Sequence, residues 1–269
     1  MFLIVNAIAV CLYIAAALYQ GLYLFHISHT APRRWVLMTL GLIATAAHAV
    51  SVTDVIYDGV HIDLSFFKVS SLISWFIALT SLLSLLRRPT GNLLVALFPL
   101  AAICIVLSRD AAPAHDMETM ITPGLLTHIL TSILAYSLMT MAALQAVILA
   151  IQERHLKHHH LGGLLKRLPP LQTMEEVLFE MIWLGMLLLS MSLLSGVLFV
   201  KDLFEQHLVH KTFFSTLAWV IFAVLLWGRH QKGWRGQTAV RWTLVGFAAL
   251  MLGYFGSKLV LELILKRNY

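Results

Sequence analysis

The sequence has few charged residues, since Asp, Glu, Lys and Arg together make up only 12% of the 269 residues. Soluble globular domains carry about 25%, and hydrophobic residues reach 59% in this chain. This balance excludes a water-soluble fold. The net charge of +6 does not indicate a nucleic-acid partner, because the basic residues lie in short loops between apolar runs, where they set membrane topology.

Cysteine is nearly absent: Cys11 and Cys104 are the only two, and both lie in apolar runs. Without a CxxC or CxxCH motif, neither a dithiol redox site nor covalent haem attachment is indicated. Carboxylates are missing from the middle of the apolar runs, which argues against a proton channel. We also find no inverted repeat of the kind that many transporters have.

Long apolar runs are what the chain does have. Each covers at least about 17 residues, enough for a helix to cross a bilayer. The first lacks a basic region before it, so we expect a retained span rather than a cleaved signal. We predict an all-α fold, a polytopic membrane helix bundle that forms a single integral membrane domain over residues 1–269. Its eight transmembrane helices are expected at approximately 3–25, 35–53, 65–86, 92–108, 125–151, 177–200, 212–229 and 242–264.

The loops predict an orientation. Most of the 19 basic residues follow the first, third, fifth and seventh spans, whereas the other loops hold most of the acidic residues. Short loops rich in Lys and Arg remain in the cytoplasm. We therefore expect both termini outside, in a multi-pass protein of the bacterial inner membrane, with the lipid bilayer as its surroundings.

Histidines are the main candidates for chemistry, because ionisable groups inside a membrane are costly and usually have a function. His48, His128 and His210 are expected in the outer third of the bilayer, where two of them could bind one haem iron from facing helices. Nineteen residues separate His230 from His210, or roughly 30 Å along a helix, so the two cannot share an ion. The alternative, a structural hydrogen-bonding role, stays open for each of them.

Four further histidines lie in the basic stretch between the fifth and sixth spans: His155, His158, His159 and His160. A metal site there is one interpretation. We favour a solvated cytoplasmic linker, because no second set of ligands accompanies the run. Zinc elsewhere is also disfavoured, because the chain lacks four ligands at short spacing.

Two segments resemble the cytochrome c assembly protein family, which handles haem in membranes and includes CcsA and CcmC types and a shorter HemX and YpjD branch. They are LLTHILTSILAYSLMTMAALQAVILAIQERHLK at 125–157 and HKTFFSTLAW…GWRG…GFAALMLGYFGSKLV at 210–260. The resemblance implies that His128 is an axial haem ligand at the outer face and that His230 corresponds to a second histidine at the inner end. Length and span count are similar to those of the shorter branch.

The sequence departs from the larger members in two places. The tryptophan-rich haem-presenting loop is replaced by EQHLVHKTFFSTLAW, and the tail reads LILKRNY without the histidine that completes the outer pair. His210 or His48 could replace that ligand.

The resemblance implies a b-type haem cofactor and a role in haem handling linked to cytochrome biogenesis, by binding rather than catalysis. Haem and other cytochrome biogenesis or membrane proteins are the expected partners. The alternative is a regulatory or scaffold protein of the HemX-like type that influences haem biosynthesis or complex assembly and holds no haem.

Overall fold

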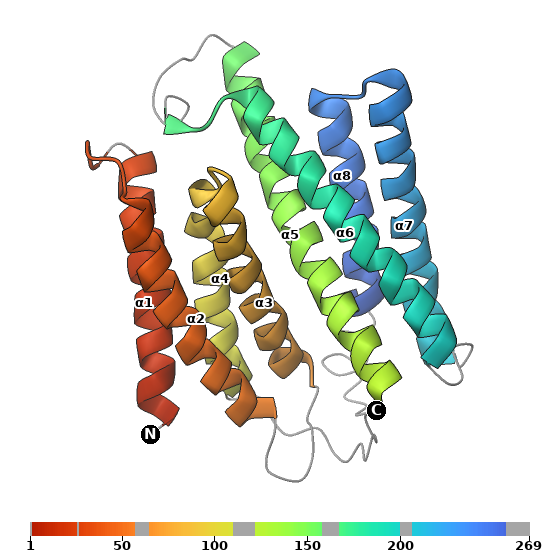
Figure 1. Ribbon diagram of the computed structural model, residues 1–269, viewed down its shortest axis with the longest axis horizontal. Coiled ribbons are helices and arrows are strands. Elements are labelled where there is room, and N and C mark those ends of the chain that lie inside the picture. The colour runs from red at the N-terminus through yellow and green to blue at the C-terminus, as the bar shows by residue number, and fades with distance from the viewer. Residues whose placement is uncertain are drawn as a thin grey trace. The chain divides into compact units, whose positions relative to one another are not determined.

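The computed structural model describes residues 2–25, 27–56, 65–109, 122–157, 167–199 and 206–256, and the regular elements in these ranges are all helices. The described ranges hold eight long helices, which are labelled in Figure 1. They are α1 (Phe2–Leu24), α2 (Arg34–Ile56), α3 (Phe66–Arg87), α4 (Gly91–Arg109), α5 (Pro123–Lys157), α6 (Leu171–Phe199), α7 (Gln206–Lys232) and α8 (Gly236–Met251), which continues as a short π-helix, η2 (Leu252–Gly256).

The predicted all-helical membrane fold is confirmed, since each of the eight expected spans corresponds to one helix. Seven of the helices are long and apolar enough to cross a membrane. The described α-helical part of α8 has 16 residues, and the end expected for this span lies outside the described residues. The outward orientation of the termini and the single domain stay predictions.

Several boundaries differ from the expected ones by six residues: α6, α7 and α8 each begin six residues early, and α5 extends to Lys157 instead of ending near residue 151. The extra turns contain Gln152, Glu153 and Arg154, which are good helix formers. An ion pair between Lys157 Nζ and Glu153 Oε1, 2.7 Å apart, further stabilises the last turn. An apolar run therefore underestimates a helix that continues into polar surroundings.

The helices form two compact units, one containing α1–α4 and the other α5–α8. In the first unit α1 packs against α2 and α4, and α3 packs against the same two helices. Small side chains such as Ala9, Ala16 and Ala44 are fully buried in its core beside Phe98. Small residues let membrane helices approach closely, which favours van der Waals packing where the hydrophobic effect is weak.

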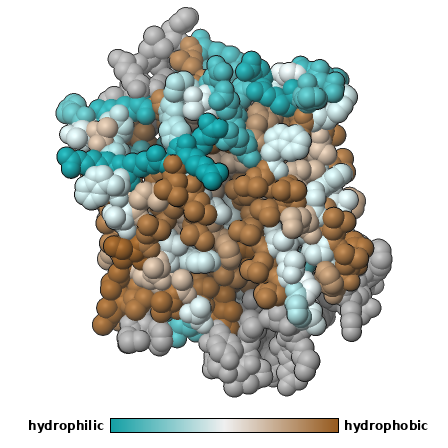
Figure 2. Space-filling view, viewed as in Figure 1, coloured by the Kyte–Doolittle hydropathy of each residue, from teal (hydrophilic) through white to brown (hydrophobic). Residues whose placement is uncertain are grey.

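In the second unit α5 packs most extensively against α6, and α7 and α8 complete the bundle. A small residue lets α8 approach α7 closely: a Cβ on Gly246 would lie 2.9 Å from the ring of Phe222 in α7. Figure 2 shows apolar side chains over the middle of the visible face and hydrophilic ones gathered toward one end. This distribution suits helices surrounded by lipid.

Candidate functional site

His128 lies near the beginning of α5 and is half-buried against α6. Its Nδ1 is 2.9 Å from the backbone carbonyl oxygen of Ser192, and the hydroxyl oxygen of Ser195 lies 3.4 Å from the same nitrogen. Figure 1 shows that α5 begins at the end of this unit where α6 ends. The His128 ring therefore faces the helix bundle.

The hydrogen bond to Ser192 determines the tautomer of His128. A carbonyl oxygen can only accept, so Nδ1 must carry the proton and donate it. In the neutral ring, Nε2 then has a lone pair, and no hydrogen-bond partner for it is found among the described residues. Histidines that bind metals usually donate their other ring N–H to a carbonyl or carboxylate in this way.

The helices around His128 are held in close contact. A Cβ on Gly196 of α6 would lie only 3.1 Å from the ring carbon Cε1 of His128. The Ser132 and Ser192 hydroxyls are 2.6 Å apart across the same helix pair, and Trp219 of α7 donates a hydrogen bond to Ser190 at 2.9 Å. The imidazole is thus oriented by α6, a helix that hydrogen bonds hold to α5 and α7, and not by a loop.

His210 is exposed in the first turns of α7, in the same unit as His128. In Figure 1, α7 begins at the end of the unit where α5 begins. Of the candidates His48, His210 and His230, His210 therefore shares both the unit and the end of the bundle with His128. His230 lies in the last turn of the continuous helix α7, which confirms that it belongs to the opposite end.

His48 is fully buried in the first unit, and both of its ring nitrogens have partners. Nδ1 lies 3.3 Å from the hydroxyl oxygen of Tyr13, and Nε2 lies 3.1 Å from the hydroxyl oxygen of Ser71. Thr45 donates to the carbonyl oxygen of Gly41 at 2.7 Å and accepts from Tyr13 at 3.3 Å.

These contacts give the network around His48 a direction. Because the carbonyl can only accept, protons point from His48 Nδ1 through Tyr13 to Thr45, and the Ser71 hydroxyl donates to Nε2. The lone pair that a metal would need is therefore already used. Ala44, His48 and Ser51 share one buried face of α2, and the hydrogen bonds of His48 are those of a structural histidine.

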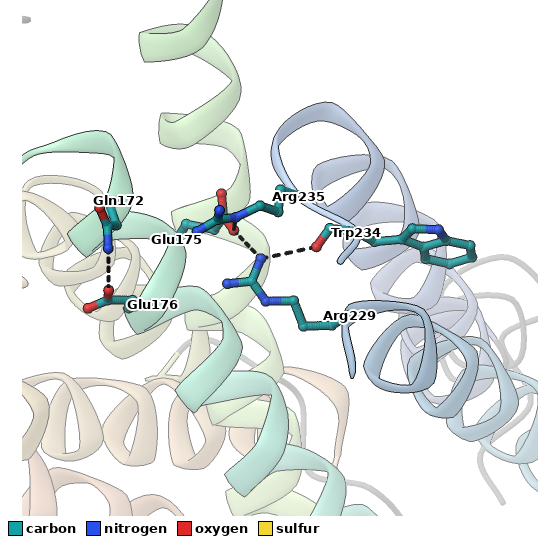
Figure 3. A network of polar contacts seen from close by, with 6 residues as sticks. All are labelled: Gln172, Glu175, Glu176, Arg229, Trp234 and Arg235. Atoms are coloured by element: carbon teal, nitrogen blue, oxygen red, sulfur yellow. Dashed lines mark hydrogen bonds and ion pairs between the residues drawn. The ribbon is translucent and has the colours of Figure 1, made fainter. Parts of the chain in front are cut away.

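His230 is exposed beside an ion-pair network at its end of the second unit. Figure 3 shows Glu175 of α6 between two arginines, with Arg229 Nη1 at 2.5 Å and Arg235 Nε at 3.1 Å from its Oε1. Arg229 also donates to the carbonyl oxygen of Trp234 at 3.2 Å. This network holds the α7–α8 turn against α6. His230 is the haem ligand that the family resemblance implies at this end.

This network does not follow from the sequence, although GWRG is among the segments that carry the family resemblance. Gly233 and Gly236 have φ values of 65° and 52°, a conformation that glycine adopts without strain. The signal that could have revealed the turn is the arginine between two glycines. Its carboxylate partner, Glu175, is 60 residues away from Arg235 in the sequence, so local spacing does not reveal the pair.

No group of three or more His, Cys, Asp or Glu side chains that could hold a metal ion occurs in the described ranges. A pair of axial histidines needs only two residues, so the expected haem ligands stay predictions. His155 is exposed, and its Nδ1 is 2.8 Å from the carbonyl oxygen of Ile151 in its own helix. His158, His159 and His160 lie outside the described residues.

The fold defines a multi-pass helical membrane protein. The model of the family described as cytochrome C assembly protein matches residues 35–265. The chain belongs to this family, as its resemblance in sequence predicted.

Several relatives narrow the comparison. Inner membrane protein YpjD of Escherichia coli strain K12 is 33% identical over 202 residues, which cover 75% of this chain and 76% of the relative. Protein HemX of Brevibacillus brevis is 24% identical over 147 residues, 54% of each chain. Cytochrome c biogenesis protein CcsA of Chlamydomonas reinhardtii is 23% identical over 188 residues, 68% of this chain and 52% of the relative. No solved structure matches the chain.

The predicted location is confirmed, because seven helices can cross a membrane and the YpjD relative is named an inner membrane protein.

Proposed function

We propose that this protein binds b-type haem and handles it during the biogenesis of c-type cytochromes, by binding rather than by catalysis. The observation that carries the proposal is the hydrogen bond from His128 Nδ1 to the Ser192 carbonyl oxygen, at 2.9 Å. It leaves the Nε2 lone pair for iron, and it orients the ring through a partner on another helix. The relatives named CcsA and HemX support the link to cytochrome and haem metabolism.

His210 is the preferred second ligand of this outer site. It lies at the same end of the same unit as His128 and is exposed, whereas both ring nitrogens of His48 are engaged by hydroxyls. Haem would supply a redox-active iron whose axial positions take neutral imidazoles. The protein's part would be to orient the His128 ring so that its Nε2 lone pair faces the iron.

His230 is the candidate for a separate site at the other end of α7. His230 is exposed and follows Arg229 in the chain. The ion pair between Arg229 and Glu175 holds this end of α7 in place. We rank His230 second because no second ligand is assigned to it.

The visible absorption spectrum of the purified full-length protein tests the proposal. We expect a Soret band with the split bands of low-spin haem, and loss of the low-spin bands in His128→Ala. His155→Ala is the matched control, since that histidine is also on α5 but its hydrogen bond in the described structure is to Ile151 of its own helix. A colourless protein that remains folded after reconstitution with haem would instead support the scaffold function of the HemX-like type.

A further inference from the structure

The first unit has a cavity of about 420 Å³ at the end where α1 and α3 finish and α2 and α4 begin. Its polar lining comes from four arginines and two carboxamides, which we call the arginine pocket: Gln20, Arg34, Arg87, Arg88, Asn92 and Arg167. The remaining wall is largely apolar, with Leu24, Leu37 and Leu85 among its residues. The pocket is therefore cationic on one side and apolar on the other.

No acidic side chain is among the described residues that line this pocket. Arg167 is fixed in place: its Nη1 donates to the carbonyl oxygens of Tyr23 and Ser28, and its guanidinium stacks on the Tyr23 ring at 4.4 Å. These partners are neutral, so they orient the arginine without cancelling its charge. The described lining therefore carries a net positive charge, which suits an anion.

Asn92 gives an independent indication of a ligand. It lines the pocket, its side chain is only 7% exposed, and its Nδ2 has no hydrogen-bond partner in the described structure. A buried donor without a partner is costly. Asn92 also lies in the first turn of α4, where backbone N–H groups have no carbonyl partner within the helix and attract anions.

We propose that the arginine pocket binds a phosphate group. Arginine forks match phosphate oxygens in geometry and charge, and the amide of Asn92 would donate one further hydrogen bond. The apolar wall and the position at the ends of membrane helices favour the headgroup of an anionic phospholipid, a ligand typical of basic pockets between such helices. A soluble phosphate would use the same contacts. The proposal is independent of haem binding.

The test uses the full-length protein with two kinds of probe. In one arm it is placed in nanodiscs of phosphatidylcholine with or without phosphatidylglycerol, and thermal unfolding and lipid retained in native mass spectrometry are measured. In the other arm, detergent-solubilised protein receives inorganic phosphate or chloride at equal ionic strength. Stabilisation by phosphatidylglycerol alone identifies a lipid headgroup, and stabilisation by inorganic phosphate identifies a soluble ligand.

Two variants make the test specific. Arg87→Gln removes one charge of the pocket, and Asn92→Leu removes the unpartnered donor at similar volume. Each should weaken binding roughly tenfold, the effect of losing one charge-assisted hydrogen bond. Without ligand, Asn92→Leu should unfold at the same or a higher temperature, since a buried unpaired amide is removed. Arg154→Gln, an exposed arginine of α5, is the charge-matched control and should behave as the wild type.

Two results would overturn the proposal. One is that neither probe stabilises the wild-type protein. The other is that stabilisation persists undiminished in both Arg87→Gln and Asn92→Leu, because the phosphate would then bind elsewhere. If Arg87→Gln does not fold, the binding measured for Asn92→Leu decides the test.

Discussion

His48 in the first unit and His128 in the second have the same protonated nitrogen but different neighbours on the other one. Each donates from Nδ1, to the Tyr13 hydroxyl in one case and to the Ser192 carbonyl in the other. The Nε2 of His48 accepts from Ser71 at 3.1 Å, whereas no partner for Nε2 of His128 occurs in the described part of the chain. Both ring nitrogens of His48 are therefore hydrogen-bonded, whereas Nε2 of His128 keeps its lone pair.

Burial alone therefore does not identify a ligand. The fully buried histidine is the one whose hydrogen bonds are complete, which is the usual state of a polar group in a protein interior. The half-buried His128 is hydrogen-bonded through Nδ1, and its Nε2 has no partner among the described residues. We expect His128 to matter for haem and His48 to matter for stability, and substitutions at or beside each histidine should separate the two roles.

The largest expected effect is on haem coordination. His210→Ala should convert six-coordinate low-spin haem to a five-coordinate high-spin form with a shifted Soret band, because one of two axial imidazoles is lost. His48→Ala should leave the spectrum low-spin. Electron paramagnetic resonance of the oxidised protein distinguishes the two states. A high-spin spectrum in His48→Ala with a low-spin one in His210→Ala would reverse the ligand assignment.

Stability should follow the opposite order. His48→Ala leaves the Tyr13 and Ser71 hydroxyls without their partner in the core of the first unit, at a cost of about 1–3 kcal/mol. His128→Ala loses one bond at a half-buried position and should cost about 1 kcal/mol or less. Thermal unfolding of both variants as haem-free proteins measures the difference. Equal losses would mean that His48 is not the more structural of the two.

Gly196→Ala should weaken haem binding without unfolding the protein. The new methyl would lie 3.1 Å from His128 Cε1, so the ring must shift by a few tenths of an ångström. Changes in the residues that orient a metal ligand reduce affinity by roughly 10–100-fold, and we expect the lower end. Haem titration measures the change. Gly246→Ala, which meets Phe222 at 2.9 Å, is a control for tight helix packing away from the histidine.

The sequence predicts features that depend on neighbouring residues better than contacts between residues far apart in the chain. Eight helices follow from apolar runs of sufficient length, and the face shared by Ala44, His48 and Ser51 follows from helical spacing. The state of each ring nitrogen does not, because the deciding partner is distant in sequence: Ser192 is 64 residues from His128, and Tyr13 is 35 from His48. Hydroxyls and carbonyls are too common for their spacing to reveal such pairs.

The smallest predicted effect concerns the Tyr13 hydroxyl. Tyr13→Phe removes the link between His48 and Thr45 but keeps the ring, which packs edge-on to His48 at 5.7 Å between centroids. Hydrogen bonds between membrane helices contribute about 0.6 kcal/mol on average, so thermal unfolding should change only slightly. The haem spectrum should not change at all. A spectral change would mean that the His48 network influences the haem site, against the separation of roles between the two histidines.

Chemical rescue of His128→Gly tests the central claim most directly. We predict that this variant loses its low-spin bands and that millimolar imidazole restores them, since the free ring can occupy the place of the missing side chain and present the same nitrogen to iron. His48→Gly should keep its haem and not respond to imidazole. If His128→Gly retains low-spin haem without imidazole, His128 is not an axial ligand and the proposed haem site is contradicted.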